Sequence, residues 1–301
     1  MKHKLKLLLI LLLLGGIADI GRYVFYPDVS ALKEERPVPT AFMEYREAQW
    51  AEENRDKEIR HKWVSFSQIS PNVIKAVLIA EDDKFWKHEG FDIGGMEQAL
   101  ERSLKKGTVA GGSTISQQLA KNLYLSPSKN PVRKFKEAIL TWRIERNLSK
   151  RRILEIYLNV AEWGDGIFGI EAAARHYYGK SAKHLSGHEA ARLAAVLPNP
   201  IKYSPVGNQK YVKNRARIIY KIMQRRGIVI PSYQEVMAPP AASEAQSDQN
   251  TSEDLNESGS IGDLFGTSQT EASSELTEEA PASETPSSPS EVSLENPPAA
   301  E

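Results

Sequence analysis

The apolar residues between positions 70 and 226 recur every three or four residues, a spacing that places them on one face of a helix. Ser70 and Pro71 are typical of a helix start, and the apolar residues that follow continue this first helix as far as Glu81. Only residues 61–67 alternate as a short strand would. The pattern predicts a mostly α fold, with further helices over residues 92–106, 114–123, 130–148, 149–160, 169–178, 186–198 and 209–226.

A hydrophobic segment at the N-terminus predicts that the protein is targeted to a membrane. Residues 1–6 contain three lysines, and a run of small or apolar residues from Leu7 to Ala18 follows them. Spanning a bilayer takes about 20 residues, so two interpretations remain open. One is a signal peptide cleaved at Gly16-Ile17-Ala18, and the other is an anchor over residues 7–26 that leaves residues 1–6 in the cytoplasm. We favour the anchor; residues 27–60 then form a charged stalk, and on either interpretation the body is exported.

Charge is unevenly distributed between the body and the C-terminal segment. The chain contains 39 basic and 39 acidic residues, but residues 239–301 hold 14 acidic residues and no basic one. Residues 1–238 therefore carry 39 basic and 25 acidic residues, a net charge of +14. Such a body suits lipid head groups, pyrophosphates or nucleic acid. The C-terminal segment is rich in Pro, Ser, Glu and Ala, which predicts a disordered acidic tail.

Glu81 is the first candidate for acid–base chemistry. It precedes Asp82 and Asp83, and neighbouring carboxylates disfavour each other's ionisation, so such a cluster can provide a base near neutral pH. The alternative is a helix end with solvated acids. His88 is expected to orient the following loop rather than to react. Because the chain has no cysteine, disulfides, zinc–thiolate sites and a cysteine nucleophile are excluded.

A Gly-rich segment suggests an anion site at the start of a helix. Residues 111–114 supply free backbone N–H groups, and the helix dipole adds positive potential. Thr114-x-x-Gln117 matches a capping box. Lys121 lies about two turns further along the same face, with Gln118 between them. An ordinary capped helix with a surface lysine would explain the same pattern.

Glu137 is the second candidate carboxylate. Arg133 lies four residues before it on the same predicted helix face, and Lys134 and Lys136 lie alongside. The simple interpretation is an ion pair between side chains one helical turn apart. The functional interpretation is a cationic cradle for a phosphate, in which Glu137 protonates an oxygen or holds a divalent ion.

Four motifs occur in a fixed order between residues 81 and 159. They are Glu81-Asp82-x-x-Phe85-x-x-His88-x-Gly90, Gly112-Ser113-Thr114-Ile115-x-Gln117-Gln118-Leu119-x-Lys121-Asn122, Arg133-Lys134-x-x-Glu137 and Arg152-Ile153-Leu154-Glu155-x-Tyr157-Leu158-Asn159. In order and spacing they resemble the motifs of the peptidoglycan glycosyltransferases, glycosyltransferase family 51. Three further strings are similar to the monofunctional biosynthetic members of Gram-negative bacteria. These strings are Thr40-Ala41-Phe42-Met43, Glu162-Trp163-Gly164-Asp165-Gly166 and Glu171-Ala172-Ala173-Ala174-Arg175-His176-Tyr177-Tyr178.

The resemblance covers about residues 37–230 and implies a lysozyme-like, two-lobed glycosyltransferase domain over residues 61–235. It also implies a single-pass anchor in the inner membrane and a catalytic domain in the periplasm. The implied reaction polymerises lipid II into β-1,4-linked glycan with inversion and releases undecaprenyl pyrophosphate. Cell-division or elongation proteins are the further candidate partners, and no nucleic acid partner is expected.

The resemblance implies roles for individual residues as well. Glu81 would be the general base on the acceptor's 4-hydroxyl. Glu137 would assist the departure of the pyrophosphate, directly or through a bound divalent cation, Mg²⁺ or Mn²⁺. The residues that would hold the pyrophosphate are Lys121, Arg133, Lys134 and Lys136. Those that would line the donor and acceptor cleft are Ser113, Thr114, Gln117 and Gln118.

Two other functions fit parts of the sequence. A lytic enzyme on the same scaffold would cleave glycan, but it has no need of the cations around Lys121 and Arg133. A membrane-tethered scaffold that acts through the acidic tail would have no need of Glu81 and Glu137. The tail itself, residues 239–301, is not expected from the family resemblance and is the part of the sequence that it leaves unexplained.

Overall fold

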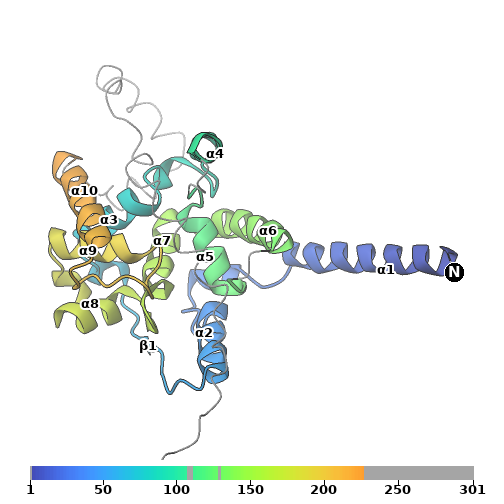
Figure 1. Cartoon of the computed structure of the whole chain (residues 1–301), viewed down its shortest axis with the longest axis horizontal. Coiled ribbons are helices and arrows are strands. Elements are labelled where there is room, and N and C mark those ends of the chain that lie inside the picture. Colours follow the sequence, from blue (N-terminus) through green and yellow to red (C-terminus); the bar gives the residue numbers. More distant parts are fainter. Residues whose placement is uncertain (1, 107–110, 128–129, 227–301) are drawn as a thin grey trace, which may run out of the picture.

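The computed structural model describes residues 2–106, 111–127 and 130–226. Figure 1 shows a helical body from which one long helix projects. Within the described residues the helices are α1 (Lys2–Gly21), α2 (Ala41–Glu52), α3 (Pro71–Glu81), α4 (Ile93–Lys106), α5 (Ile115–Tyr124), α6 (Pro131–Asn147), α7 (Lys150–Val160), α8 (Ile170–Tyr178), α9 (Gly187–Val196) and α10 (Lys210–Arg226). Short 3-10 turns lie at η1 (Arg22–Val24), η2 (Ser30–Lys33), η3 (Phe66–Gln68), η4 (Phe85–Lys87) and η5 (Ala182–His184). The mostly α fold class is confirmed, while the predicted tail, residues 239–301, lies outside the described residues.

Side-chain caps begin the helices at the positions that the sequence indicates. The Ser70 hydroxyl accepts a backbone hydrogen bond at the start of α3, and Asn130 and Ser149 do the same for α6 and α7. Thr114 and Gln117 form a reciprocal capping box at the start of α5, and α9 begins with the same arrangement. These caps satisfy N–H groups that the helix itself leaves unpaired. The predicted helices between residues 70 and 226 are confirmed, with ends shifted by one or two residues.

The core lies where two groups of helices pack. α3 packs against α9 and α10, and α5 packs against α6 and α7. Each contributes side chains that are fully removed from water, such as Val77 of α3, Leu119 of α5, Ile156 of α7 and Leu193 of α9. Burying each of these side chains contributes about 1.5–3 kcal/mol to folding. The packing therefore fixes the C-terminal end of α3, where Glu81 lies, against α5 and α10.

A small sheet completes the body. β1 (Arg60–His61) runs parallel to β3 (Ile167–Phe168), which pairs antiparallel with β2 (Glu162–Gly164). The strand predicted over residues 61–67 is present only at His61: residues 62–65 have no regular structure, and η3 begins at Phe66. Gly166 turns the chain between β2 and β3 with φ +79°, and a Cβ there would lie 2.5 Å from the Trp50 ring. Glycine is therefore required at this turn by both backbone and space.

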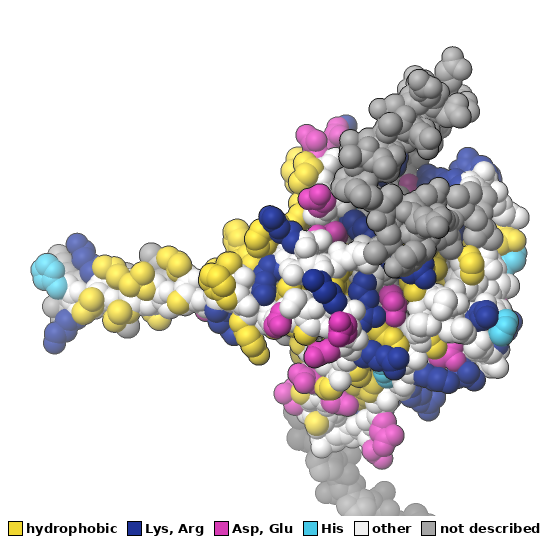
Figure 2. Space-filling view, turned by 180° about the vertical axis from the view of Figure 1, so that it is seen from behind, with side chains coloured by type: hydrophobic (Ala, Val, Ile, Leu, Met, Phe, Trp, Pro, Cys, Tyr) yellow, Lys and Arg dark blue, Asp and Glu magenta, His cyan; other side chains and the backbone are white. Residues whose placement is uncertain are grey.

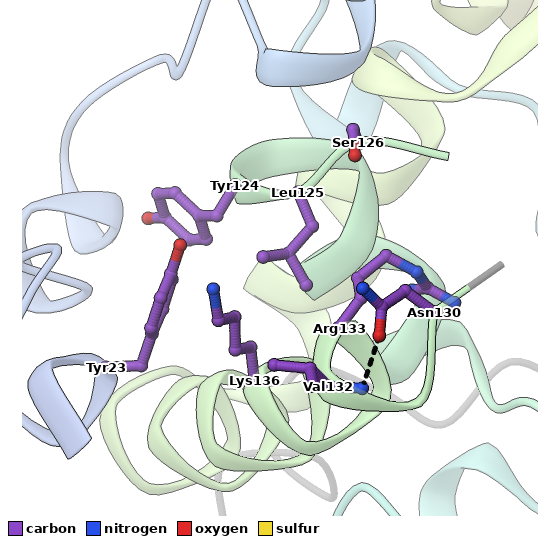
Figure 3. A pocket seen from close by; sticks show the side chains of 8 residues that line it. All are labelled: Tyr23, Tyr124, Leu125, Ser126, Asn130, Val132, Arg133 and Lys136. Atoms are coloured by element: carbon purple, nitrogen blue, oxygen red, sulfur yellow. Dashed lines mark hydrogen bonds between the residues drawn. The ribbon is translucent and has the colours of Figure 1, made fainter. Parts of the chain in front are cut away.

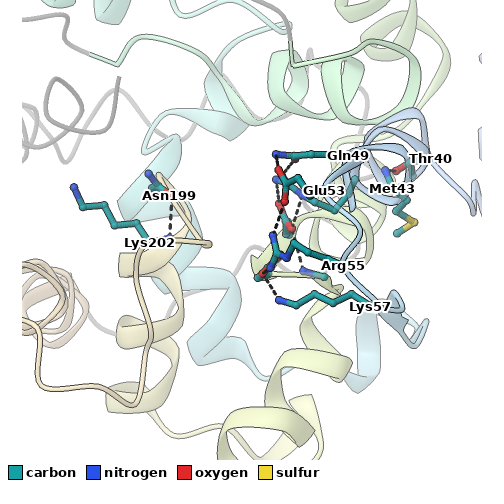
Figure 4. A network of polar contacts seen from close by, with 12 residues as sticks. Thr40, Met43, Gln49, Glu53, Arg55, Lys57, Asn199 and Lys202 are labelled. Atoms are coloured by element: carbon teal, nitrogen blue, oxygen red, sulfur yellow. Dashed lines mark hydrogen bonds and ion pairs between the residues drawn. The ribbon is translucent and has the colours of Figure 1, made fainter. Parts of the chain in front are cut away.

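Part of the segment predicted as a stalk is built into the body. α2 packs against α5, and its Met43 and Trp50 are fully buried. Arg46 of α2 forms a buried ion pair of 2.8 Å with Glu162 of β2. Beyond the end of α2, Asp165 accepts hydrogen bonds from Arg55 and Lys57. Figure 4 shows Arg55 and Lys57 in this polar network. These contacts tie residues 41–57 to the β2–β3 turn.

α1 extends away from the body (Figure 1), and Figure 2 shows apolar side chains along it and around its base. Leu11, Leu12 and Ile17 each expose more than half of their surface. Among the residues that the structure describes, we find no helix whose length and apolar character would carry it across a membrane.

Candidate active site

Glu81 is the last residue of α3, and three other elements surround its carboxylate. Gln118 of α5 donates a hydrogen bond of 2.9 Å to Oε2, and Arg215 of α10 lies 3.4 Å from Oε1. The Tyr157 hydroxyl on α7 donates to Oε1 of Gln118 at 3.1 Å, which fixes the orientation of the amide. The Glu81 side chain is 11% exposed. The carboxylate is therefore held in place yet keeps some access to solvent.

The electrostatic environment makes Glu81 a stronger base than an ordinary glutamate. Burial raises the pKa of its carboxyl group, because the charged form loses hydration. Arg215, the Gln118 hydrogen bond and the Lys121 ammonium act in the opposite direction and favour the charged form. A carboxylate with a raised pKa accepts a proton more readily, which is what general base catalysis near neutral pH requires.

The loop after Glu81 is fastened to the start of α5 by Asp82. Asp82 Oδ2 accepts the backbone N–H of Ile115 at 2.9 Å, and Oδ1 lies 2.9 Å from Nε2 of His88. The Thr114 hydroxyl adds a bond of 2.7 Å to the carbonyl of Gly90. His88 therefore orients the loop, as the sequence indicated, and the turn at Glu81 and the start of α5 form one unit.

The residues predicted to line a cleft fall into two groups. Thr114 and Gln117 are buried, and their side chains bond to each other's backbone N–H groups in the capping box. Ser113 is exposed beside them, and Gln118 faces Glu81. Of the four residues, Gln118 is the one whose side chain reaches the candidate base.

Lys121 links the two candidate carboxylates. Burial lowers the pKa of its ammonium group, whereas Glu137 and Glu81 both raise it. The ammonium lies 6.0 Å from the centre of the Phe42 ring on α2, which is within the range of a cation–π contact. The structure therefore places a half-buried cation in the field of both predicted catalytic acids.

Glu137 is buried on α6 and is held by two cations. Arg133 Nη1 lies 2.5 Å from Oε2, and Lys134 contacts Oε1. The predicted ion pair between Arg133 and Glu137 is thus present. Because Lys121 is also influenced by Arg133 and Lys134, these groups form one positive cluster around Glu137, which we call the cationic cluster.

Lys136 of α6 pairs with the N-terminal segment. Its ammonium lies 2.5 Å from Asp19 and 5.1 Å from the centre of the Tyr23 ring. Figure 3 shows it in a pocket of about 210 Å³ between the N-terminal segment, the end of α5 and the start of α6. Arg133 lines the same pocket from the other side. Lys136 therefore shares a pocket with Arg133 while its own ion pair is with Asp19, and its contact with the pyrophosphate stays a prediction.

Glu137 and its neighbours do not form a binding site for the predicted divalent cation. Both carboxylate oxygens are engaged by Arg133 and Lys134, and among the described residues no group of three His, Asp or Glu side chains could hold a metal ion. A Mg²⁺ ion needs several oxygen ligands in octahedral geometry. The residues present do not fit a protein-held ion, so we assign no step to one, and the cation stays a prediction.

Arg215 is the residue of the site that sequence reasoning missed. It lies on the face of α10 that otherwise carries buried apolar residues such as Val212 and Ile219. A cation on the apolar face of a predicted helix is unusual, because burying an unpaired charge is costly. The arginine within the apolar pattern of this helix was therefore a sequence signal that could have identified Arg215 as a site residue.

The fold and the site are those expected of an enzyme that carries out acid–base chemistry on an anionic substrate. A largely buried carboxylate with a raised pKa and a cationic cluster lie on neighbouring helices of a mostly α domain. A family model described as Transglycosylase matches residues 47–224, and the chain belongs to this family. The predicted family is confirmed, and with it a glycosyl-transferring enzyme.

Several proteins of this family are closely similar to the chain. The biosynthetic peptidoglycan transglycosylase of Laribacter hongkongensis is 48% identical over 217 residues, which cover 72% of this chain and 92% of that protein. The protein of the same name from Methylobacillus flagellatus is 52% identical over 187 residues, covering 62% and 82%. That from Azoarcus sp. is 55% identical over 179 residues, covering 59% and 78%.

Proposed function

We propose that the protein polymerises lipid II into β-1,4-linked glycan strands of the cell wall and releases undecaprenyl pyrophosphate. The observation that carries this proposal is the arrangement of Glu81, Lys121 and Glu137. A carboxylate poised as a base and a cluster suited to a diphosphate are joined by Lys121, a half-buried cation that both acids influence. The names of the relatives, which specify peptidoglycan biosynthesis, support the same substrate class.

In the proposed reaction Glu81 acts on the acceptor. Its carboxylate takes the proton from the 4-hydroxyl of the acceptor sugar as the oxygen attacks the anomeric carbon of the donor. The anomeric bond to the pyrophosphate breaks from the opposite face, so the configuration inverts. Gln118 and Arg215 hold the carboxylate during this step, and Arg215 keeps it ionised despite its burial.

The cationic cluster acts on the donor. Lys121, Arg133 and Lys134 stabilise the negative charge that develops on the departing pyrophosphate, as preorganised cations do in other phosphate sites. Glu137 positions Arg133 and Lys134 before substrate arrives and assists departure. Ser113, and the N-terminus of α5 that Thr114 and Gln117 shape, line the donor and acceptor cleft. Lys136 would contact the lipid-linked phosphate from the pocket beside Tyr23.

Purified protein, lipid II in detergent micelles and a divalent cation form the test of this function, with polymer measured on gels. Glu81→Gln should lose at least about 100-fold in rate, the scale of general base catalysis. Asp83→Asn is the matched control, because this exposed carboxylate lies two residues away and pairs with Arg226 instead. If Glu81→Gln polymerises at the rate of wild type, Glu81 is not the base. If wild type makes no polymer, the function itself is wrong.

We further propose that residues 7–26 anchor the enzyme in the inner membrane in a single pass, with the catalytic domain in the periplasm. The support for this proposal is the sequence: residues 7–26 have about the length that a bilayer requires and begin with an apolar run from Leu7 to Ala18. Asp19 and Arg22 form an ion pair of 3.1 Å, which lowers the cost of placing either charge near the lipid. Resistance of the full chain to alkaline extraction from membranes would support the anchor, whereas release would exclude it.

A further inference from the structure

The outer face of α10 carries a row of cations. They are the exposed side chains of Lys210, Lys213, Arg217, Lys221 and Arg225, which we call the α10 stripe. Their spacing of three and four residues places them along one side of the helix. The opposite side holds the buried core residues, such as Val212 and Ile219. The stripe is therefore a continuous basic surface about 25 Å long, the length of a 17-residue helix.

The stripe has no counter-charge on its own helix. α10 contains no acidic residue, and among the described residues its ion pairs are those of Arg215 with Glu81 and of Arg226 with Asp83. Neighbouring cations four residues apart repel one another. Lys210 and Lys213 also lie at the N-terminal end, where the helix dipole disfavours positive charge. An anionic partner would relieve both effects.

The partner with matching charge is part of the same chain. Residues 239–301 contain 14 acidic residues and no basic one, and 12 residues separate them from the end of α10. Twelve residues span at most about 40 Å when fully extended, so the first acids of this segment reach every part of the stripe. Tethering also gives the segment an effective concentration near the millimolar range. We propose that the acidic segment, residues 239–301, docks on the α10 stripe of its own chain.

The position of the stripe argues against a lipid surface as its occupant. α10 lies at the end of the body opposite to the point where α1 leaves it (Figure 1). A helix that faces away from the N-terminal helix is poorly placed to contact the membrane that this helix would enter. The acidic segment, in contrast, follows α10 in the chain after 12 residues and is therefore tethered close to the stripe.

The absence of cysteine from the chain allows the docking to be measured directly in the full-length protein. Asn214→Cys on the exposed side of α10 and Ser258→Cys in the acidic segment give two unique positions for a fluorescent donor and acceptor. Energy transfer should be high at low ionic strength and should fall by about half or more when salt rises to 1 M, where the screening length is about 3 Å.

Two variants with the same loss of charge make the test specific. Lys210→Gln, Lys213→Gln and Lys221→Gln together should lower the transfer at low salt to the high-salt level. The matched control replaces three exposed lysines elsewhere, Lys33, Lys87 and Lys183, by Gln and should leave the transfer unchanged. Circular dichroism of both variants checks that α10 still folds.

Four results would overturn the proposal. Transfer that is low at every salt concentration means that the segment does not dock. An equal loss in both variants means attraction to the body in general rather than to the stripe. Transfer only between singly labelled chains means that the partner is a second copy. Loss of binding to anionic vesicles in the stripe variant, with unchanged transfer, means that the stripe serves a lipid surface.

Discussion

Burial acts in opposite directions on the two ionisable groups at the centre of the site. It raises the pKa of Glu81 and lowers the pKa of Lys121, because each charged form loses hydration. Each group also lies in the field of the other, which restores part of the charge on both. At the scale of single residues, the site is therefore a balance between desolvation and attraction, and changing one member shifts the protonation of the others.

Arg215→Met tests this balance through the pH dependence of the rate. The base must be ionised, so activity falls as the pH drops through the raised pKa of Glu81. Removing the Arg215 charge takes away the strongest influence that lowers this pKa, and the acid limb of kcat/KM should move up by about one pH unit or more. Arg217→Met, on the exposed side of the same helix, should leave the limb in place. An unmoved limb in Arg215→Met would show that Arg215 does not tune the base.

The stability of the protein should also depend on the ionisation of Glu81, but it should fall as the pH rises, whereas the activity rises. Because the pKa of Glu81 is raised in the folded state, the folded protein binds more protons than the unfolded one between pH 4.5 and the raised value. Wild type therefore loses stability relative to Glu81→Gln as the pH rises through this window, and the difference levels off above it. Urea unfolding at several pH values measures it, and a difference that does not vary with pH would contradict the assignment.

Lys121 and Lys136 are expected to differ in their contribution to anion binding. Lys121 belongs to the cationic cluster, whereas Lys136 is paired with Asp19 beside Tyr23. Lys121→Met should weaken the binding of a lipid-pyrophosphate analogue by about 10- to 100-fold, the value of a charged hydrogen bond. Lys136→Met is the matched variant and should weaken it less. Titration calorimetry in detergent measures both affinities. Equal losses of affinity in the two variants would mean that both lysines bind the same anion.

At the scale of helices and strands, local sequence signals were sufficient to predict where the helices start. They were not sufficient to predict contacts between positions far apart in the chain. Ser70, Thr114 and Ser149 are capping residues whose effect lies within one turn, so the helix starts could be predicted from the sequence. The contact between Arg215 and Glu81 joins positions 134 residues apart, and no local pattern encodes it. The packing of α2 on α5 was missed for the same reason.

The attachment of α2 can be tested at its buried ion pair. Arg46 and Glu162 are almost fully removed from water, and Glu162 also accepts the backbone N–H of Gly166. Arg46→Met leaves the carboxylate buried without its cation and should cost about 3–5 kcal/mol of unfolding free energy. Adding Glu162→Gln removes the unpaired charge and keeps the acceptor for Gly166, so it should restore part of the loss. No restoration in urea unfolding would mean that the Arg46 side chain stabilises α2 by packing alone.

For the whole molecule, the segregation of charge between body and tail sets how the enzyme meets anionic surfaces. Deleting residues 239–301 removes 14 negative charges from a chain whose net charge is zero, and leaves a body of +14. Binding to vesicles with anionic lipid should therefore strengthen at low salt, because the negative charge of the tail no longer offsets those cations of the body that lie near the lipid, each of which contributes about 1 kcal/mol. The gain should vanish near 1 M salt and be absent on neutral vesicles. Cosedimentation of the full and shortened chains with both vesicle types measures it. A gain that persists on neutral vesicles would trace the effect to apolar residues such as those of α1, and the acidic segment would then have no part in controlling surface binding.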